Sequence, residues 1–159
     1  MKNTIKIVAL FVMAASAVSF NFKEEPMEEL KWNTWNTGYP LIRSKDKIGL
    51  IDVYTDWCGW CKRMDKDTYA KKEIIDKINK DFVPIKFNPE AQGVYYIDST
   101  AYSGPQLYAM LSNNSPSGYP TTYFLIPKDD VTYIQIVAGY HNAEGFSKIL
   151  DQIKSGATK

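Results

Sequence analysis

The spacing of hydrophobic and polar residues predicts strands and helices that alternate along most of the chain. Lys47–Tyr54 is an almost continuous apolar run, which is typical of a strand buried on both faces of a parallel or mixed sheet. From Cys61 to Asn79 the apolar residues recur at helical spacing, with a break near Thr68 to Ala70. Phe82–Phe87 is predicted to form a second strand.

The last part of the chain predicts a hairpin followed by a helix. Thr121–Ile126 and Thr132–Ala138 are strand-like, and the turn residues Pro127–Asp130 between them make them antiparallel neighbours. One apolar face of a final helix then consists of Phe146, Ile149, Leu150 and Ile153. The resulting element order, β-α-β-α-β-β-α, is that of an α/β fold.

The stretch Asn88–Gly118 has the least regular pattern and is rich in Ser, Asn, Gly and Tyr. Within it, Pro105–Leu111 can form a helix and Val94–Tyr102 a small hairpin. We expect both to lie between the second strand and the C-terminal hairpin.

Composition and charge indicate one folded unit. The chain has 159 residues, 45% of them hydrophobic, which is enough to build one continuous core. Lys plus Arg number 19 against 18 Asp plus Glu, so the net charge of +1 creates no field that would gather nucleic acid or an anionic membrane. We expect a monomer that binds no nucleic acid.

The first residues have the pattern of a secretory signal peptide. Lys2 and Lys6 precede the apolar run Ile7–Ala15, and Ala15-Ser16-Ala17 fits the small-x-small cleavage pattern. A membrane anchor is the alternative, but a spanning helix needs about 20 apolar residues and this run is shorter. We predict cleavage after Ala17 and a mature protein outside the cytosol, in the periplasm.

A polar and charged stretch follows the apolar run. Residues 18–29 include Pro26 and several charged side chains, and they are predicted to be a flexible lead-in. The folded domain is predicted to occupy residues 30–155.

Two cysteines carry the candidate chemistry, in the sequence Trp57-Cys58-Gly59-Trp60-Cys61. Because a strand ends just before Cys58 and a helix begins there, helix N–H groups and the helix dipole would stabilise a Cys58 thiolate. Cys61 lies one turn further along, where its sulfur can attack a mixed disulfide formed at Cys58. The spacing predicts an exposed, nucleophilic Cys58 and a resolving Cys61.

A pair of cysteines can also serve other purposes than thiol exchange. A structural zinc site needs four ligands, whereas the mature chain has two Cys and the single His141. Covalent haem attachment needs His after the second Cys, where Lys62 stands. A purely structural disulfide across so short a loop would contribute roughly 2 kcal/mol. A binding module without turnover, holding copper through Cys58, Cys61 and His141 or holding a client chain, is the alternative function.

Asp52 lies inside the first strand, within an apolar run. On a covered face of the sheet, desolvation would raise the pKa of this carboxyl toward the range useful for proton transfer. The alternative is an Asp on an exposed strand face.

Two segments resemble the thioredoxin superfamily. Leu50–Lys62 is similar to its active-site strand, loop and helix, and Gly118–Thr122 is similar to its cis-proline loop. The resemblance is closest to secreted bacterial thioredoxin-like proteins and to the periplasmic C-terminal domain of DsbD. It implies a thioredoxin-like fold, a central mixed β-sheet flanked by α-helices.

The resemblance also implies an activity, thiol-disulfide exchange with protein substrates and without a bound cofactor or metal. It places Asp52 behind Cys61 as a proton acceptor, with Lys86 nearby. The favoured direction of electron flow is reduction of the substrate, and a membrane-embedded electron donor would then reduce the protein again. The dipeptide Gly59-Trp60 differs from those of cytosolic thioredoxins and of the oxidant DsbA, which leaves the direction of electron flow open.

The residues that flank the thiols are candidate substrate contacts: Trp57, Gly59, Trp60, Tyr119 and Pro120. Tyr123 is predicted to be core. The Tyr119-Pro120 bond is predicted to be cis and to pack against the cysteines, because an X-Pro bond adopts cis at modest cost. A trans proline that starts an edge strand is the alternative.

Overall fold

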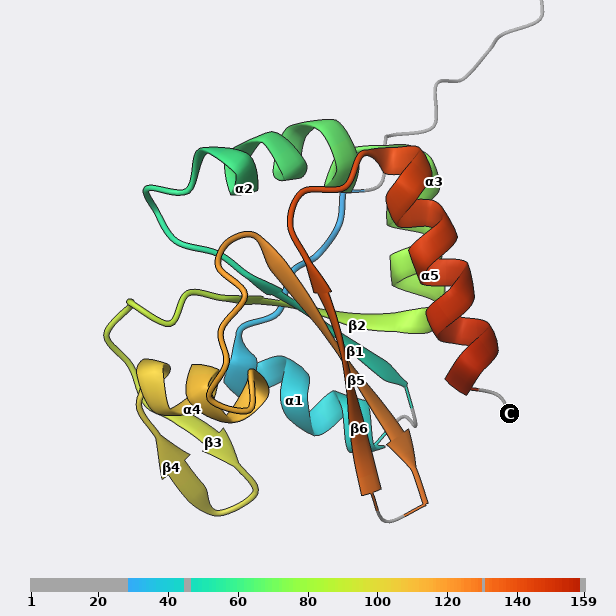
Figure 1. Ribbon diagram of the computed structural model, residues 1–159. Coiled ribbons are helices and arrows are strands. Elements are labelled where there is room, and N and C mark those ends of the chain that lie inside the picture. The colour runs from blue at the N-terminus through green and yellow to red at the C-terminus, as the bar shows by residue number, and fades with distance from the viewer. Residues whose placement is uncertain (1–28, 45–46, 130, 158–159) are drawn as a thin grey trace, which may run out of the picture.

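The sheet is built around strand β1 (Ile48–Val53), which is buried along its whole length in the computed structural model. Strand β2 (Phe82–Phe87) pairs with β1 in parallel, and strand β5 (Thr121–Lys128) pairs with it antiparallel on the other side. Strand β6 (Val131–Ala138) completes the order β2-β1-β5-β6 (Figure 1). The α/β class and the mixed central sheet are therefore confirmed.

The structure describes residues 29–44, 47–129 and 131–157. The predicted signal peptide, residues 1–17, and the lead-in up to residue 28 lie outside the described residues. Helix α1 (Trp35–Ser44) is the first helix of the described residues and α5 (Ala143–Ala157) is the last, and the domain limits of 30 and 155 stay a prediction.

Helices cover both faces of the sheet (Figure 1). Ile48 and Leu50 of β1 pack in one apolar cluster, whereas Ile51 and Val53 pack in the other. The first cluster is covered by α2 (Gly59–Met64), the π-helical turn η1 (Asp65–Tyr69), α3 (Lys72–Asp81) and α5 (Ala143–Ala157). The second is covered by α1 (Trp35–Ser44) and α4 (Gly104–Leu111). The predicted break near Thr68 to Ala70 lies at the end of η1, just before the start of α3.

The C-terminal hairpin has longer strands than expected. Pro127 pairs with Thr132 and Lys128 with Val131, so the predicted four-residue turn Pro127–Asp130 was too long. Pairing between β1 and β5 extends to Leu125, and beyond that residue β5 has a neighbour on one side alone. A proline is tolerated there because a strand with one neighbour needs fewer backbone N–H donors, and proline has none to offer.

Helix α1 was missing from the sequence prediction. Gly38 and Pro40 interrupt its pattern, and both residues disfavour helix interiors. Tertiary contacts compensate: the indole of Trp35 donates a hydrogen bond of 2.8 Å to the backbone oxygen of Tyr96. Gly38 lies so close to Ile85 that a larger residue would collide with it. Helix α1 therefore depends on packing more than on propensity.

The segment between β2 and β5 forms both predicted elements. Strands β3 (Tyr95–Ile97) and β4 (Thr100–Tyr102) form the small hairpin. Helix α4 begins with a capping box between Ser103 and Gln106, which satisfies backbone N–H groups at its first turn. Its N-terminus packs directly on the chain after β2.

Gly104→Ala should destabilise the protein by about 1–3 kcal/mol, because an added Cβ would lie 2.3 Å from the backbone oxygen of Pro89. A backbone atom cannot move aside as a flexible side chain can. Urea unfolding measures the effect, with Gly156→Ala in α5 as the matched control, since a Cβ there meets nothing within 4 Å. An equal midpoint for both variants would contradict the tight contact.

Candidate functional site

The two cysteines lie at the point where the chain leaves β1 and enters α2. Cys58 is the N-cap residue of α2 and is joined to Cys61 by a disulfide, with the two Cα atoms 5.3 Å apart. The Cys61 backbone N–H donates a hydrogen bond of 3.1 Å to the Cys58 sulfur. A sulfur held by a helix N–H at a first turn is in an environment that favours a thiolate once the bond is reduced.

The exposure of the cysteines differs from the expectation. In this oxidised state Cys58 is 4% exposed and Cys61 is 3% exposed. The expected difference in exposure between the cysteines is therefore absent here, because the bond holds the Cys58 sulfur against the first turn of α2.

Two tryptophans project beside the disulfide. Trp57 is 68% exposed and Trp60 is 53% exposed. The Trp57 indole donates a hydrogen bond of 2.9 Å to Glu90. Trp60 lies 5.3 Å from the ring of Tyr140, and the guanidinium of Arg63 sits over both rings. The residues that flank Cys58 and Cys61 in the sequence thus carry large exposed rings, each of which contacts a second residue.

The predicted cis bond is present between Tyr119 and Pro120. Thr121, which follows it, pairs with Val53 at the end of β1, so this loop lies at the same end of the sheet as the cysteines. The ring of Tyr119 contacts that of Trp57 edge-on at 5.7 Å. Direct packing of Pro120 on the sulfurs remains a prediction. Tyr123 is fully buried in the core, as expected.

Asp52 is 1% exposed and lies on the same face of β1 as Ile48 and Leu50, the face that α2 covers. It accepts hydrogen bonds from Lys86 and, at 3.4 Å, from the Tyr69 hydroxyl. Burial raises the pKa of Asp52, and the attraction of Lys86 offsets only part of that effect. The exposed-face alternative is wrong.

Lys86 bridges two carboxylates. Its ammonium pairs with buried Asp52 and with the more exposed Asp65, and it lies over the rings of Trp32 and Tyr54 at 4.8 and 5.0 Å. Burial lowers the pKa of Lys86, but the two carboxylates outweigh burial and raise it overall. Lys86 therefore stays charged beside Asp52.

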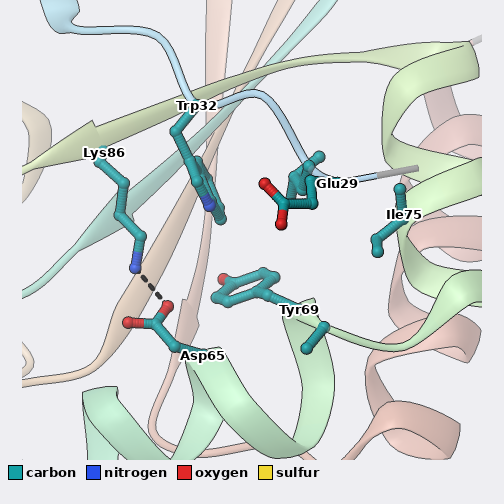
Figure 2. A pocket seen from close by; sticks show the side chains of 8 residues that line it. Glu29, Trp32, Asp65, Tyr69, Ile75 and Lys86 are labelled. Carbon is teal, nitrogen blue, oxygen red and sulfur yellow. Dashed lines mark hydrogen bonds and ion pairs between the residues drawn. The ribbon is translucent and has the colours of Figure 1, made fainter. Parts of the chain in front are cut away.

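A cavity of about 390 Å³ opens next to this pair. Figure 2 shows Trp32, Asp65, Tyr69 and Lys86 around it, with the Lys86–Asp65 ion pair at its wall. Solvent in the cavity would reach Asp65 and Lys86, which connect it to the buried Asp52.

Asp65 and Tyr69 were missed as site residues. They follow Cys61 at intervals of four, and this spacing places residues on one helical face. That spacing could have indicated that both residues lie on the same helical face as Cys61. Their contacts, of Asp65 with Lys86 on β2 and of Tyr69 with Asp52 on β1, depend on how the strands pack against η1, which the spacing does not reveal.

The copper alternative needs Cys58, Cys61 and His141 as ligands. Across residues 29–44, 47–129 and 131–157, no group of three or more His, Cys, Asp and Glu side chains is placed to hold a metal ion. His141 instead lies within 3.3 Å of the Ala138 backbone oxygen.

In the same described ranges, no helix has the length and apolar character needed to cross a membrane.

Three features define a thioredoxin-fold protein. They are a mixed sheet flanked by helices, a disulfide at the first turn after the central strand, and a cis-proline before the neighbouring strand. The chain belongs to the Thioredox_DsbH family, described as a protein of unknown function, DUF255, which matches residues 13–158. This is a thioredoxin-like family of disulfide oxidoreductases related to DsbD and DsbH.

Known proteins agree with this assignment. The chain is 21% identical over 133 residues to the thiol:disulfide interchange protein DsbD of Haemophilus influenzae, covering 80% of the chain and 21% of DsbD. It is 28% identical over 107 residues to DsbD of Escherichia coli K12, covering 67% of the chain and 17% of DsbD. The chain thus spans about a fifth of the length of these curated relatives.

Solved structures share the fold. A thioredoxin from Thermus thermophilus superposes with a TM-score of 0.67 at 18% identity, covering 82% of this chain and 91% of that one. A DsbH oxidoreductase superposes with a TM-score of 0.57 at 15% identity, covering 84% and 93%. The oxidised DsbD C-terminal domain of Neisseria meningitidis has a TM-score of 0.50 at 22% identity, covering 72% and 87%.

Proposed function

We propose that this protein is a thiol-disulfide oxidoreductase that reduces disulfides in other proteins. The observation that carries the proposal is the Cys58–Cys61 disulfide at the first turn of α2, flanked by the exposed rings of Trp57 and Trp60. A sulfur in that position is acidified by the helix, and the rings offer apolar contacts to a polypeptide.

The reaction starts from the reduced pair. The Cys58 thiolate attacks one sulfur of a substrate disulfide, forms a mixed disulfide and releases the other substrate sulfur as a thiolate. Cys61 then loses its proton and attacks the Cys58 sulfur, which releases the second substrate thiolate. The substrate gains two electrons and the protein becomes the disulfide seen in the structure.

We assign Asp52 as the acceptor of the Cys61 proton. It lies on the face of the sheet that α2 covers, and burial raises its pKa toward the range in which it can take up and lose a proton. Lys86 keeps the carboxylate form of Asp52 accessible, and Asp65 links Lys86 to the cavity. The proton can then leave along charged groups that touch solvent.

Turnover needs a source of electrons. We propose that a membrane-embedded dithiol donor reduces the Cys58–Cys61 disulfide, and that the protein works as a monomer, without a cofactor, in the periplasm. The basic and apolar residues of 1–17 support export, since they fit a signal peptide. The similarity to the thiol:disulfide interchange protein DsbD supports thiol-disulfide exchange with another protein.

The equilibrium redox potential of the Cys58–Cys61 pair tests the direction of electron flow. A reductase should have a potential of about −200 mV or lower, toward the value of about −270 mV for thioredoxin, whereas strong oxidants lie near −120 mV. The potential is measured from the tryptophan fluorescence of the protein after equilibration with glutathione buffers of known composition. A value near −120 mV would contradict the reductase assignment.

Reduction of insulin with dithiothreitol tests for turnover itself. The wild-type protein should accelerate insulin precipitation well above the dithiothreitol background, as thiol exchange through an acidified cysteine is faster than through an ordinary thiol. Binding of insulin without acceleration would favour the alternative of a client-holding module.

A further inference from the structure

The hydroxyl of Tyr69 lies between two polar side chains from neighbouring strands. It is 3.4 Å from Oδ1 of Asp52 on β1 and 3.3 Å from the hydroxyl of Thr122 on β5. Asp52 and Thr122 are directly opposite each other in the antiparallel pairing of these strands. All three side chains are buried, so each of these hydrogen bonds replaces one that water would otherwise provide. The proposed proton acceptor therefore shares its hydrogen bonding with a tyrosine from η1.

The Tyr69 ring is held by two edge-on aromatic contacts. Its centroid lies 4.9 Å from the ring of Trp32 and 5.3 Å from the ring of Phe146 on α5, with interplanar angles of 88° and 85°. Figure 2 shows the Tyr69 ring beside Trp32 at the wall of the cavity. Because the ring is held, the hydroxyl oxygen stays in place, and its hydrogen is the part that can turn from one partner to the other.

Tyr69 keeps its own proton. Burial raises the pKa of Tyr69 well above its usual value, and the neighbouring carboxylate of Asp52 raises it further. The phenol is thus a neutral group that has one hydrogen to donate and lone pairs with which to accept. A neutral phenol is not a base for the Cys61 thiol, so Tyr69 acts on the reaction through Asp52.

We infer that Tyr69 is a positioning residue that turns its hydroxyl hydrogen from Asp52 to Thr122 when Asp52 takes up a proton, an inference that rests on the proposed function. While Asp52 is a carboxylate, Tyr69 donates to its Oδ1 and Lys86 donates to its Oδ2. Once Oδ1 carries the proton taken from Cys61, it becomes a donor to the Tyr69 oxygen, and Tyr69 donates to Thr122. Only hydrogens move, and every polar group keeps a partner in both states.

The two partners of Tyr69 should affect Asp52 in opposite directions. Charged or titratable groups on two other elements act on Asp52: Lys86 on β2, and Asp65 and Tyr69 on η1. Burial raises the pKa of Asp52, whereas Lys86 and the hydrogen bond from Tyr69 lower it. Loss of the Tyr69 hydroxyl removes a donor to the carboxylate, so the pKa of Asp52 should rise. Loss of the Thr122 hydroxyl removes the acceptor that Tyr69 needs when Asp52 is protonated, so the pKa should fall.

The test is an NMR titration of the Asp52 carboxyl carbon in the oxidised full chain, in which the joined cysteines do not titrate. Tyr69→Phe should raise the midpoint by about one pH unit, and Thr122→Val should lower it by roughly half a unit. Tyr123→Phe is the matched control, because Tyr123 is also buried but packs in the apolar cluster on the opposite face of the sheet. It should leave the midpoint unchanged.

The same shifts should appear in the release of substrate from a preformed mixed disulfide at Cys58. The pH profile of the release rate should move to higher pH in Tyr69→Phe and to lower pH in Thr122→Val. In an Asp52→Asn background, Tyr69→Phe should not move the profile, because its effect passes through the Asp52 carboxyl.

Equal midpoints for the wild type and Tyr69→Phe would overturn the inference. A fall of the midpoint in both Tyr69→Phe and Thr122→Val would also overturn it, because loosened packing that admits water returns a desolvated carboxyl toward its usual pKa. If the wild-type protein reduces insulin in either case, the proposed function survives. Failure of the wild-type protein to reduce insulin would contradict the proposed function and, with it, the role of Tyr69 in release.

Discussion

Cys61→Ala should leave the protein covalently bound to its substrates, and Cys58→Ala should form no such complex. Cys58 is the N-cap of α2, and in the proposed mechanism its sulfur is the nucleophile while Cys61 releases the substrate. Without the resolving thiol, the mixed disulfide at Cys58 persists. Non-reducing electrophoresis after incubation with an oxidised protein substrate should show near-complete capture by Cys61→Ala, and insulin reduction should fall to background in both variants.

The two variants control for each other. Each loses the same disulfide, which closes the same short loop, so a difference between them reports chemistry rather than stability. In the reduced wild-type protein, a limiting amount of iodoacetamide at neutral pH should label Cys58 in preference to Cys61. Capture by Cys58→Ala, or equal labelling of the two thiols, would reverse the assignment.

Asp52→Asn should slow the release of substrate by roughly a hundredfold at neutral pH, the low end of what general base catalysis supplies, and the difference should shrink below the pKa of Asp52. Burial raises the pKa of Asp52, so its carboxylate forms over a higher pH range than that of an ordinary aspartate. The wild-type release rate should rise through that range, and the variant should lack the rise until the Cys61 thiol ionises unaided. Decay of a preformed mixed disulfide at Cys58, followed against pH, measures this.

Asp76→Asn is the matched control, because Asp76 is an exposed carboxylate on α3 that pairs with Lys72. Its release profile should match that of the wild type. Identical profiles for wild type and Asp52→Asn would exclude Asp52 as the proton acceptor.

Unfolding provides an independent measure of the Asp52 pKa. The pKa of Asp52 is raised in the folded protein, so the folded state holds this proton more tightly than the unfolded state does. As the pH rises from the unfolded pKa through the folded pKa, the contribution of Asp52 to the free energy of unfolding is therefore lost. Relative to Asp52→Asn, the wild-type protein should therefore lose stability across that interval. Urea unfolding at a series of pH values should show the difference growing with pH, and a constant difference would contradict the raised pKa.

The local pattern of residues was sufficient for most of the fold. The run Lys47–Tyr54 predicts β1 because burial on both faces requires continuous apolar residues, and the structure buries all of Ile48–Val53. The same run contains Asp52, whose burial follows from its position. The placement of Cys58 at a helix start follows from the order of strand and helix.

Long-range packing decided the rest. Helix α1 escaped prediction because Gly38 and Pro40 weaken its pattern, while its stabilising contacts come from Ile85 and Tyr96, far along the chain. The turn after β5 was misplaced because the length of a hairpin depends on its partner strand.

The surroundings of the thiols also depended on tertiary structure. Residues close in sequence share a helix face or strand face by simple periodicity, but Asp52, Lys86 and Asp65 meet because β1, β2 and η1 pack together. A cavity of about 280 Å³ lined by Pro89, Tyr108 and Tyr119 likewise lies between segments that are far apart in the sequence. The sequence alone therefore indicated the cysteine pair and the strand before it, and packing decided which charged and aromatic groups surround them.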